Sequence, residues 1–295
     1  MGVLSGMTGF ARVTGEADWG TWAWEAKSVN GRSLDVRVNA PPGFDAFERD
    51  VKALAGERFN RGSLQVSLRI DLASGGSGAV VDHALLGMLM DAARKAHGGE
   101  LNAESVVALM GLKGVVETGS ASTRELAGDE AVVAVLSAGV RTALDQLLAA
   151  RRAEGRDLAG VLSGHLDEIE SLAAEASALA ATQPGLIKAR LVKQLEELDR
   201  EGRVDAERFA AEAALSAARA DVREELDRLG AHVRSGRELL NAGSPAGRKL
   251  DFLAQELNRE ANTLCSKSAS LELTNAGLSL KGVIDQFKEQ SANVE

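Results

Sequence analysis

The stretch WAWEAKSVNGRSLDVRVN, residues 22–39, contains an Asn-Gly step between two runs that favour β-strands. Asn-Gly at 30–31 is the strongest short-range signal for a two-residue β-hairpin. In the second run, Leu34, Val36 and Val38 alternate with polar residues, which predicts a sheet with one buried and one solvent-exposed face. We therefore expect these two runs to form a hairpin.

The residues that follow extend this pattern into a layered unit. Pro41 and Pro42 end the second run, and apolar residues between 44 and 59 recur at helical intervals. Residues 63–72 alternate again between apolar and polar side chains. The order strand, strand, helix, strand predicts a sheet that is covered on one face by a helix.

Beyond this unit the sequence is mainly helical. ASGGSGA at 73–79 is typical of a loop or linker, and residues 82–97 and 128–154 show helical spacing. From about 155 the helical spacing continues with an interruption at Pro184, which indicates a helical hairpin of coiled-coil type.

These patterns predict an α+β fold in three parts. Residues 1–154 would form an N-terminal α+β domain, residues 155–203 the helical hairpin, and residues 204–295 a C-terminal helical domain. A chain of 295 residues is longer than one ordinary core usually takes, which agrees with more than one domain.

Composition points to a globular protein of the cytoplasm. The chain is 45% hydrophobic and 26% charged, and no apolar run approaches the roughly 20 residues of a membrane span. The N-terminal residues lack the basic and apolar regions of an export signal. Cys265 is the one cysteine, which excludes an internal disulfide and a cysteine-rich zinc site.

Charge and aromatic content limit how the protein could bind nucleic acid. The net charge is −9, which argues against electrostatic wrapping around nucleic acid as a whole. Aromatic residues make up only 3% of the chain and tyrosine is absent, so we do not expect an aromatic platform for stacking bases. RNA would have to be bound through arginine, lysine, the backbone and a metal.

Two carboxylates share one face of a C-terminal helical segment. RKLDFLAQELNREANTLCSK, residues 248–267, has an apolar stripe and places Glu256 and Glu260 one helical turn apart. Like charges at this spacing cost a few tenths of a kcal/mol unless a positive group lies between them. A bound cation or a basic partner helix would remove that cost.

The preceding helical segment carries a second polar pair. Glu225 and His232 are two turns apart on one face, and AGSPAG at 242–247 breaks the chain before the next helix. If the two helices pack antiparallel, three carboxylates and an imidazole come together, a donor set that suits Mg²⁺ or Mn²⁺. Salt bridges between the helices explain the same carboxylates, with Arg228, Arg234 and Arg259 as candidate partners.

Other charged residues here also allow two interpretations. Asp221 and Glu224 have the spacing of a helix capping box, and Asp205 fits the cap of the helix before it. Arg248 and Lys249 stand at the start of a helix, where cations are disfavoured but where a phosphate would be bound well.

Several familiar catalytic motifs are missing from the sequence. There is no GxxxxGK[ST] loop, no GxGxxG after a strand, no GxSxG elbow and no HExxH. Nothing near Cys265 in the sequence would activate its thiol. The candidate chemistry therefore rests on the acidic residues and the histidine of the last helices.

Five segments at the two ends of the chain carry a specific pattern: SGMTGFAR at 5–12, WEAKSVNGRSLDVRV at 24–38, RADVREELDRLGAHV at 219–233, GRKLDFLAQELNREANTLCSKS at 247–268 and QFKEQSANVE at 286–295. With these segments in this order, the chain resembles the YicC/YloC family of bacterial endoribonucleases. Residues 73–200 match mainly in length and helical character.

The resemblance implies a metal-dependent endoribonuclease that acts on single-stranded or structured RNA as a ring-like homo-oligomer, a hexamer. It also implies that the C-terminal helices hold the acidic and histidine residues. Carried over by motif, these positions are Asp221, Glu224, Glu225, His232, Asp251, Glu256, Arg259 and Glu260.

Pattern and resemblance together lead to one hypothesis for the metal site. Glu225, Glu256 and Glu260 would hold Mn²⁺ or Mg²⁺, and His232 would bind the ion or act as a general acid/base. The same four residues are the candidate catalytic residues. Weaker candidates for metal ligands are Asp221, Glu224 and Asp251.

RNA would be bound by two groups of cations. One group grips phosphates beside the metal site and consists of Arg248, Lys249 and Arg259. The other guides RNA across the N-terminal sheet and consists of Arg12, Arg32 and Arg37. We expect RNA and further copies of the chain as partners, and neither DNA nor a membrane.

The sequence departs from the family pattern at two positions. Family members commonly read Ser-Val-Asn-His-Arg where this chain has Gly31, so any RNA contact by that histidine is missing here. Glycine favours a tight turn instead. Cys265 stands where a small residue, usually glycine, is expected.

Two other functions remain open. An oligomeric RNA clamp or adaptor that recruits a separate nuclease would keep the basic residues but need no acidic cluster. A purely structural coiled-coil protein would explain residues 155–200 but not the N-terminal strands or the acidic helix pair.

Overall fold

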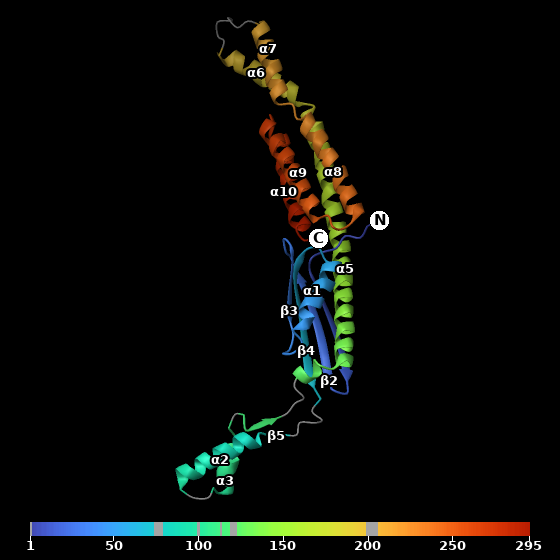
Figure 1. Cartoon of the computed structure of the whole chain (residues 1–295). Coiled ribbons are helices and arrows are strands. Elements are labelled where there is room, and N and C mark those ends of the chain that lie inside the picture. Colours follow the sequence, from blue (N-terminus) through green and yellow to red (C-terminus); the bar gives the residue numbers. More distant parts are fainter. Residues whose placement is uncertain (1, 74–78, 99–100, 113, 119–122, 199–205) are drawn as a thin grey trace.

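The computed structural model describes residues 2–73, 79–98, 101–112, 114–118, 123–198 and 206–295. Their arrangement is elongated (Figure 1). A β-sheet lies in the middle, a helical bundle adjoins one end, and a small unit of short helices lies at the other end. The sequence predicts an α+β fold, and the structure confirms it.

The central sheet has four strands in the order β1-β2-β4-β3. The strands are β1 (Gly9–Ala17), β2 (Gly20–Val29), β3 (Leu34–Asn39) and β4 (Gly62–Leu72). β2 pairs antiparallel with both β1 and β4, whereas β3 runs parallel to β4.

The predicted hairpin at Asn30-Gly31 is wrong, because β4 lies between β2 and β3. The hairpin of this sheet is formed by β1 and β2, where Ala17 is opposite Gly20. A Cβ atom at Gly31 would lie 2.9 Å from the backbone of Gly62, the first residue of β4. Glycine at 31 therefore lets the connection to β3 pass closely over the start of β4.

Two helices cover one face of the sheet. They are α1 (Ala46–Arg58) and the first half of α5 (Glu130–Ala180). Trp24 of β2 lies beneath both, because its ring contacts Phe47 and its Nε1 donates to the carbonyl oxygen of Leu136 at 2.9 Å. The predicted order of strand, strand, helix and strand is confirmed, and α5 completes the layer.

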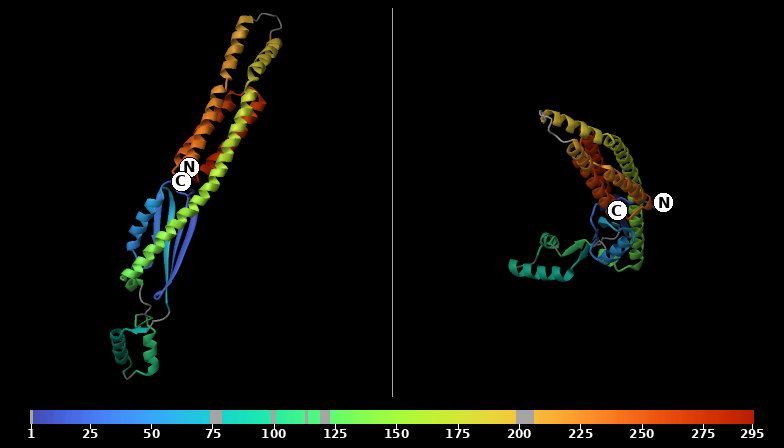
Figure 2. Two further views of the ribbon diagram at one scale, coloured as in Figure 1. Left: turned by 90° about the vertical axis from the view of Figure 1, so that its right-hand side faces the viewer. Right: turned by 90° about the horizontal axis from the view of Figure 1, so that it is seen from above.

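The 51-residue helix α5 runs along the sheet and into the helical bundle (Figure 2). It contains the expected domain boundary at 154/155. By length and composition α5 could also span a membrane, although the sequence showed no uninterrupted apolar run. Its buried residues instead pack in two cores, one against the sheet and one against the C-terminal helices.

The helical hairpin predicted for residues 155–203 has a different arrangement. Pro184 lies in the first turn of α6 (Gln183–Leu198), where the missing N–H of proline is tolerated. α6 packs against α7 (Ala206–Arg219), while α5 packs against α8 (Arg223–Ala242). The expected helix cap Asp205 lies outside the described residues.

The C-terminal bundle consists of α8, α9 (Gly247–Lys267), α10 (Leu271–Ser291) and the second half of α5. Its core contains leucines from all four helices, including Leu166, Leu229, Leu257 and Leu280. α9 begins where the apolar stripe predicted it, and the short segment after α8 reverses the chain so that α8 and α9 lie side by side.

Arg151 of α5 joins the sheet to the bundle. Its fully buried guanidinium donates to the carbonyl oxygens of Gly6 at 2.7 Å and Arg61 at 3.1 Å. Its Nη2 lies 3.3 Å from Oε2 of the buried Glu295. Burial lowers the pKa of Arg151, and the charges of Glu295 and Glu154 oppose that shift.

A small unit adjoins the other end of the sheet. It contains β5 (Ala79–Val81), α2 (His83–His97), α3 (Ala103–Met110) and β6 (Val116–Thr118), and α4 (Thr123–Leu126) leads from it into α5. β5 and β6 form a two-stranded antiparallel sheet. Most of the linker expected at 73–79 lies outside the described residues.

Candidate metal and RNA site

A three-residue cluster lies between α8 and α9. One ligand atom each from His232, Glu256 and Glu260 lies within 4.8 Å of the other two. His232 comes from α8, and the two glutamates are one turn apart on α9. The predicted packing of the two helices across the break at 242–247 therefore brings an imidazole and two carboxylates together.

Arginines contact both carboxylates of this cluster. Arg228 Nη1 lies 3.4 Å from Oε1 of Glu260, which is only 3% exposed. Arg259 Nη1 lies 3.7 Å from Oε2 of Glu256. Two cations therefore balance the like charges that one helical turn stacks together.

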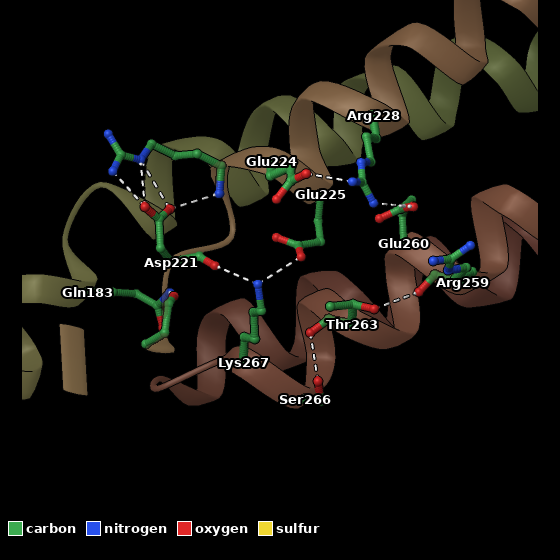
Figure 3. Close-up of polar contacts among 12 residues, drawn as sticks. Gln183, Asp221, Glu224, Glu225, Arg228, Arg259, Glu260, Thr263, Ser266 and Lys267 are labelled. Carbon is green, nitrogen blue, oxygen red and sulfur yellow. Dashed lines mark hydrogen bonds and ion pairs between the residues drawn. The ribbon is translucent and has the colours of Figure 1, made fainter. Parts of the chain in front are cut away.

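Arg228 also contacts a third carboxylate, that of Glu224 (Figure 3). The negative charges of Glu224 and, second, Glu260 raise the pKa of Arg228. This side chain therefore spans from the first turn of α8 to the buried glutamate of the cluster. The sequence pointed to Arg228 as a candidate salt-bridge partner but not as part of the site.

A groove leads from the cluster along α8 and α9 to the start of α9. Its volume is about 660 Å³. His232 and Glu256 line one part of it, and Arg248, Lys249 and Phe252 line another. The two cations that were expected to grip phosphates thus share a continuous groove with two members of the cluster.

Comparison with known proteins assigns the chain to a family. The family description "Endoribonuclease YicC-like, N-terminal region" matches residues 4–160, and "Endoribonuclease YicC-like, C-terminal" matches residues 162–295. The chain belongs to the YicC-like endoribonuclease family. The resemblance inferred from the sequence is thereby confirmed.

Two relatives are similar over almost their whole length. A protein of Haemophilus influenzae named "Probable endoribonuclease YicC" is 33% identical, over 99% of this chain and 100% of the relative. A protein of Clostridioides difficile with the same name is 26% identical, over 98% of this chain and 99% of the relative. Both relatives and both family descriptions thus carry the name endoribonuclease.

Glu225 does not lie in the cluster, contrary to the hypothesis for the metal site. Its buried carboxylate accepts a hydrogen bond from Lys267 Nζ at 2.8 Å, and Lys267 also donates to the carbonyl oxygen of Asp221 (Figure 3). The seven residues from Glu225 to His232 span roughly 10 Å of helix, and the ligand atoms that converge within 4.8 Å come from His232, Glu256 and Glu260. Glu225 instead joins the beginning of α8 to the end of α9.

The three weaker ligand candidates also lie outside the cluster. Asp221 accepts from the backbone and side chain of Arg223, and these hydrogen bonds lower its pKa to about 2. The predicted capping box is absent, because Asp221 caps the Arg223 amide while Glu224 pairs with Arg228. Asp251 is exposed and accepts from Gln255 at 3.1 Å.

The three arginines expected to guide RNA belong to the sheet unit. Arg12 lies 3.6 Å from Glu25, and Arg37 lies 3.2 Å from Asp35, so carboxylates partly neutralise both. Arg32 is exposed in the connection before β3. The structure brings none of these three into the groove.

Phe252 is a groove residue that the sequence reasoning missed. Its side chain is 63% exposed although it belongs to an amphipathic helix. The low aromatic content of the whole chain argued against a stacking surface, but one ring at the right place is enough to stack one base. Its position four residues before Glu256 was the available signal, because that spacing places both residues on one side of the helix.

Proposed function

We propose that this protein is a metal-dependent endoribonuclease that cleaves RNA at the groove between α8 and α9. His232, Glu256 and Glu260 would hold the divalent ion, Mn²⁺ or Mg²⁺. The observation that supports this most directly is the convergence of one imidazole and two carboxylates within 4.8 Å, in a chain of the YicC-like endoribonuclease family.

The donor atoms fit such an ion. Carboxylate oxygens are the preferred ligands of Mg²⁺, and a set of two oxygens and one nitrogen also suits Mn²⁺. Three protein ligands leave coordination positions for water and substrate, as catalytic metal sites require. When bound, the ion would neutralise phosphate charge and activate the attacking water or 2′-hydroxyl.

Besides the metal ligands, the protein would contribute cationic side chains that bind the phosphates of the RNA. Arg228 and Arg259 already contact Glu260 and Glu256, so both lie beside the position that a scissile phosphate would occupy. Arg248 and Lys249 line the groove further along and would bind a neighbouring phosphate. These contacts orient the RNA strand and stabilise its negative charge.

The first experiment measures cleavage of a labelled RNA by purified protein with Mn²⁺, with Mg²⁺ and with EDTA. We expect cleavage that requires the metal and that falls by at least about a hundredfold in Glu256→Gln and Glu260→Gln. Glu289→Gln on α10 is the matched control, because Glu289 is exposed and outside the cluster. Circular dichroism would show that each variant is folded.

A second readout separates metal binding from activity. Calorimetric titration with Mn²⁺ should show binding to wild type and to Glu289→Gln, and weaker binding to the two cluster variants. RNA binding without cleavage in any metal, unchanged in the cluster variants, would reject the proposal and favour the RNA clamp. If cleavage occurs, the 3′ ends of the products identify the nucleophile.

We also propose that the protein is a homo-oligomer, for which the resemblance implies a hexamer. In support, α3 has no buried residue, and Met88, Val107 and Leu112 of the small unit are 65%, 68% and 47% exposed. A unit of this size gains stability by burying such side chains against another surface. Light scattering after gel filtration should give the molar mass of a multimer for wild type. The double variant Met88→Ser, Val107→Ser should have a lower molar mass. A monomeric wild type would refute the proposal.

We also propose a substrate and a cellular location for the protein. RNA, not DNA, would be the substrate, so a DNA strand of the same sequence should not be cut. The cytoplasmic location and the absence of a membrane partner can be tested by cell fractionation.

A further inference from the structure

The groove between α8 and α9 extends past the cluster, and its far part is built differently. His232 and Glu256 lie at the cluster, whereas Leu239, Leu253 and Phe252 provide an apolar surface beyond it. The Phe252 side chain is 63% exposed, so it is accessible to a ligand in the groove.

Two cations border the same apolar surface. Arg248 and Lys249 are exposed, and neither side chain has a hydrogen-bond or ion-pair partner among the residues that the structure describes. Many other cations of the bundle, such as Arg237, Arg228 and Lys267, are paired with carboxylates. Glu238 also lines this part of the groove, so two cations and one carboxylate border the apolar surface, and Glu256 lies beyond it at the cluster.

We propose that this part of the groove holds one unpaired nucleotide of the RNA, with its base stacked on Phe252 and its phosphate against Arg248 and Lys249. The assignment rests on the proposed function, because the adjacent nucleotide would then carry the scissile phosphate at the cluster. It adds the substrate class, which is an RNA segment whose bases are free to leave the helical stack.

The spacing along α9 supports this assignment. Phe252 precedes Glu256 by four residues, or roughly 6 Å of helix, and Lys249 precedes it by roughly 10 Å. The aromatic ring thus lies between the metal ligand and the cations on nearly one side of the helix. A strand that follows the groove would meet the cluster, the ring and the two cations in that order.

A stacking ring selects unpaired RNA. Inside a duplex the bases stack on each other and their faces are unavailable, whereas single-stranded loops and ends can present a base to an aromatic side chain. A stacked base is sequence-tolerant, because every base has a π-face. We therefore expect preference for unpaired segments with little dependence on the base at this position.

The test uses a single-stranded RNA with 2-aminopurine at the nucleotide next to the cleaved bond. Stacking on an aromatic ring quenches this fluorophore, so wild-type protein and Phe252→Trp should quench it and Phe252→Leu should not. We expect Phe252→Leu to raise KM roughly tenfold with little change in kcat, because one stacking contact is lost. Phe10→Leu is the matched control, because Phe10 is 52% exposed and lies on β1 outside the groove.

The cations are tested by salt dependence. Lys249→Gln should weaken RNA binding and lower the slope of log Kd against log salt by about one, because one phosphate contact is lost. Equal quenching by wild type and Phe252→Leu, with equal KM, would overturn the proposal. If the protein nevertheless cleaves RNA in a metal-dependent way, only the stacking site is rejected and the proposed nuclease function stands. If no cleavage occurs, quenching still tests the stacking site by itself.

Discussion

Arg228 on α8 contacts Glu260 on α9, with 3.4 Å between Nη1 and Oε1, and so places a positive charge on a buried carboxylate of the candidate metal cluster. Glu256 has a similar partner in Arg259. Glu256 and Glu260 therefore form ion pairs with arginines, and the same carboxylates are the candidate ligands of the metal ion. The sequence allowed either a metal site or salt bridges at these carboxylates. In the first case their positive partner is a metal ion, and in the second it is an arginine.

This relationship predicts that Arg228 competes with a bound metal ion. Arg228→Gln should bind Mn²⁺ about two- to fivefold more tightly than wild type in the absence of RNA, because Glu260 loses its competing cation. Cleavage should nevertheless fall, since the phosphate loses a positive neighbour. Calorimetry measures the affinity, and Arg234→Gln on the same helix is the control. An unchanged or weaker affinity would show that Arg228 does not compete with an ion.

The Glu225–Lys267 pair should matter for stability and not for metal binding. Lys267→Met should lower the free energy of unfolding by about 1–3 kcal/mol, because it leaves the buried Glu225 without its hydrogen-bond donor. Glu225→Gln should keep the Mn²⁺ affinity of wild type within about twofold. Urea unfolding measures the stability of Lys267→Met, and calorimetry measures the Mn²⁺ affinity of Glu225→Gln. A large loss of Mn²⁺ affinity in Glu225→Gln would return Glu225 to the metal site.

His232 should contribute to metal binding as a ligand of the cluster. His232→Gln should bind Mn²⁺ at least about tenfold more weakly than wild type, because the imidazole nitrogen is removed from the donor set. Calorimetric titration with Mn²⁺ measures the affinity. An unchanged affinity in His232→Gln would show that the imidazole is not a ligand.

Arg151 should couple the sheet to the helical bundle. Its guanidinium contacts Gly6, Ser28, Arg61 and Glu295 from a fully buried position. Arg151→Met should cost about 3–5 kcal/mol, because the buried Glu295 would lose its counter-charge. Unfolding followed by tryptophan fluorescence reports on the sheet, because Trp22 and Trp24 lie on β2 and Trp19 lies in the turn between β1 and β2. Circular dichroism reports mainly on the helices. Two separate transitions are expected in the variant, and a single transition at wild-type stability would contradict this role.

Sequence patterns were sufficient for features that depend on residues close together in the chain. The alternation in 34–38 and 63–72 identified two strands, the apolar stripe identified α9, and the spacing of Glu256 and Glu260 placed both on one helical face. Backbone geometry alone sets these relations, because a helix repeats every 3.6 residues and a strand every two.

Only the tertiary structure decided which elements meet. Asn30-Gly31 had the local signal of a hairpin, but β4 pairs with both β2 and β3 and separates them. Glu225 and His232 shared a predicted face, yet the chain reversal after α8 placed His232 opposite Glu256 and left Glu225 opposite Lys267. The sequence by itself thus determined β3, β4, α9 and the stacked carboxylates, whereas β1 and α3 were not predicted. The partners of those carboxylates, and the groove beside Phe252, depend on contacts between distant residues, which local periodicity does not specify.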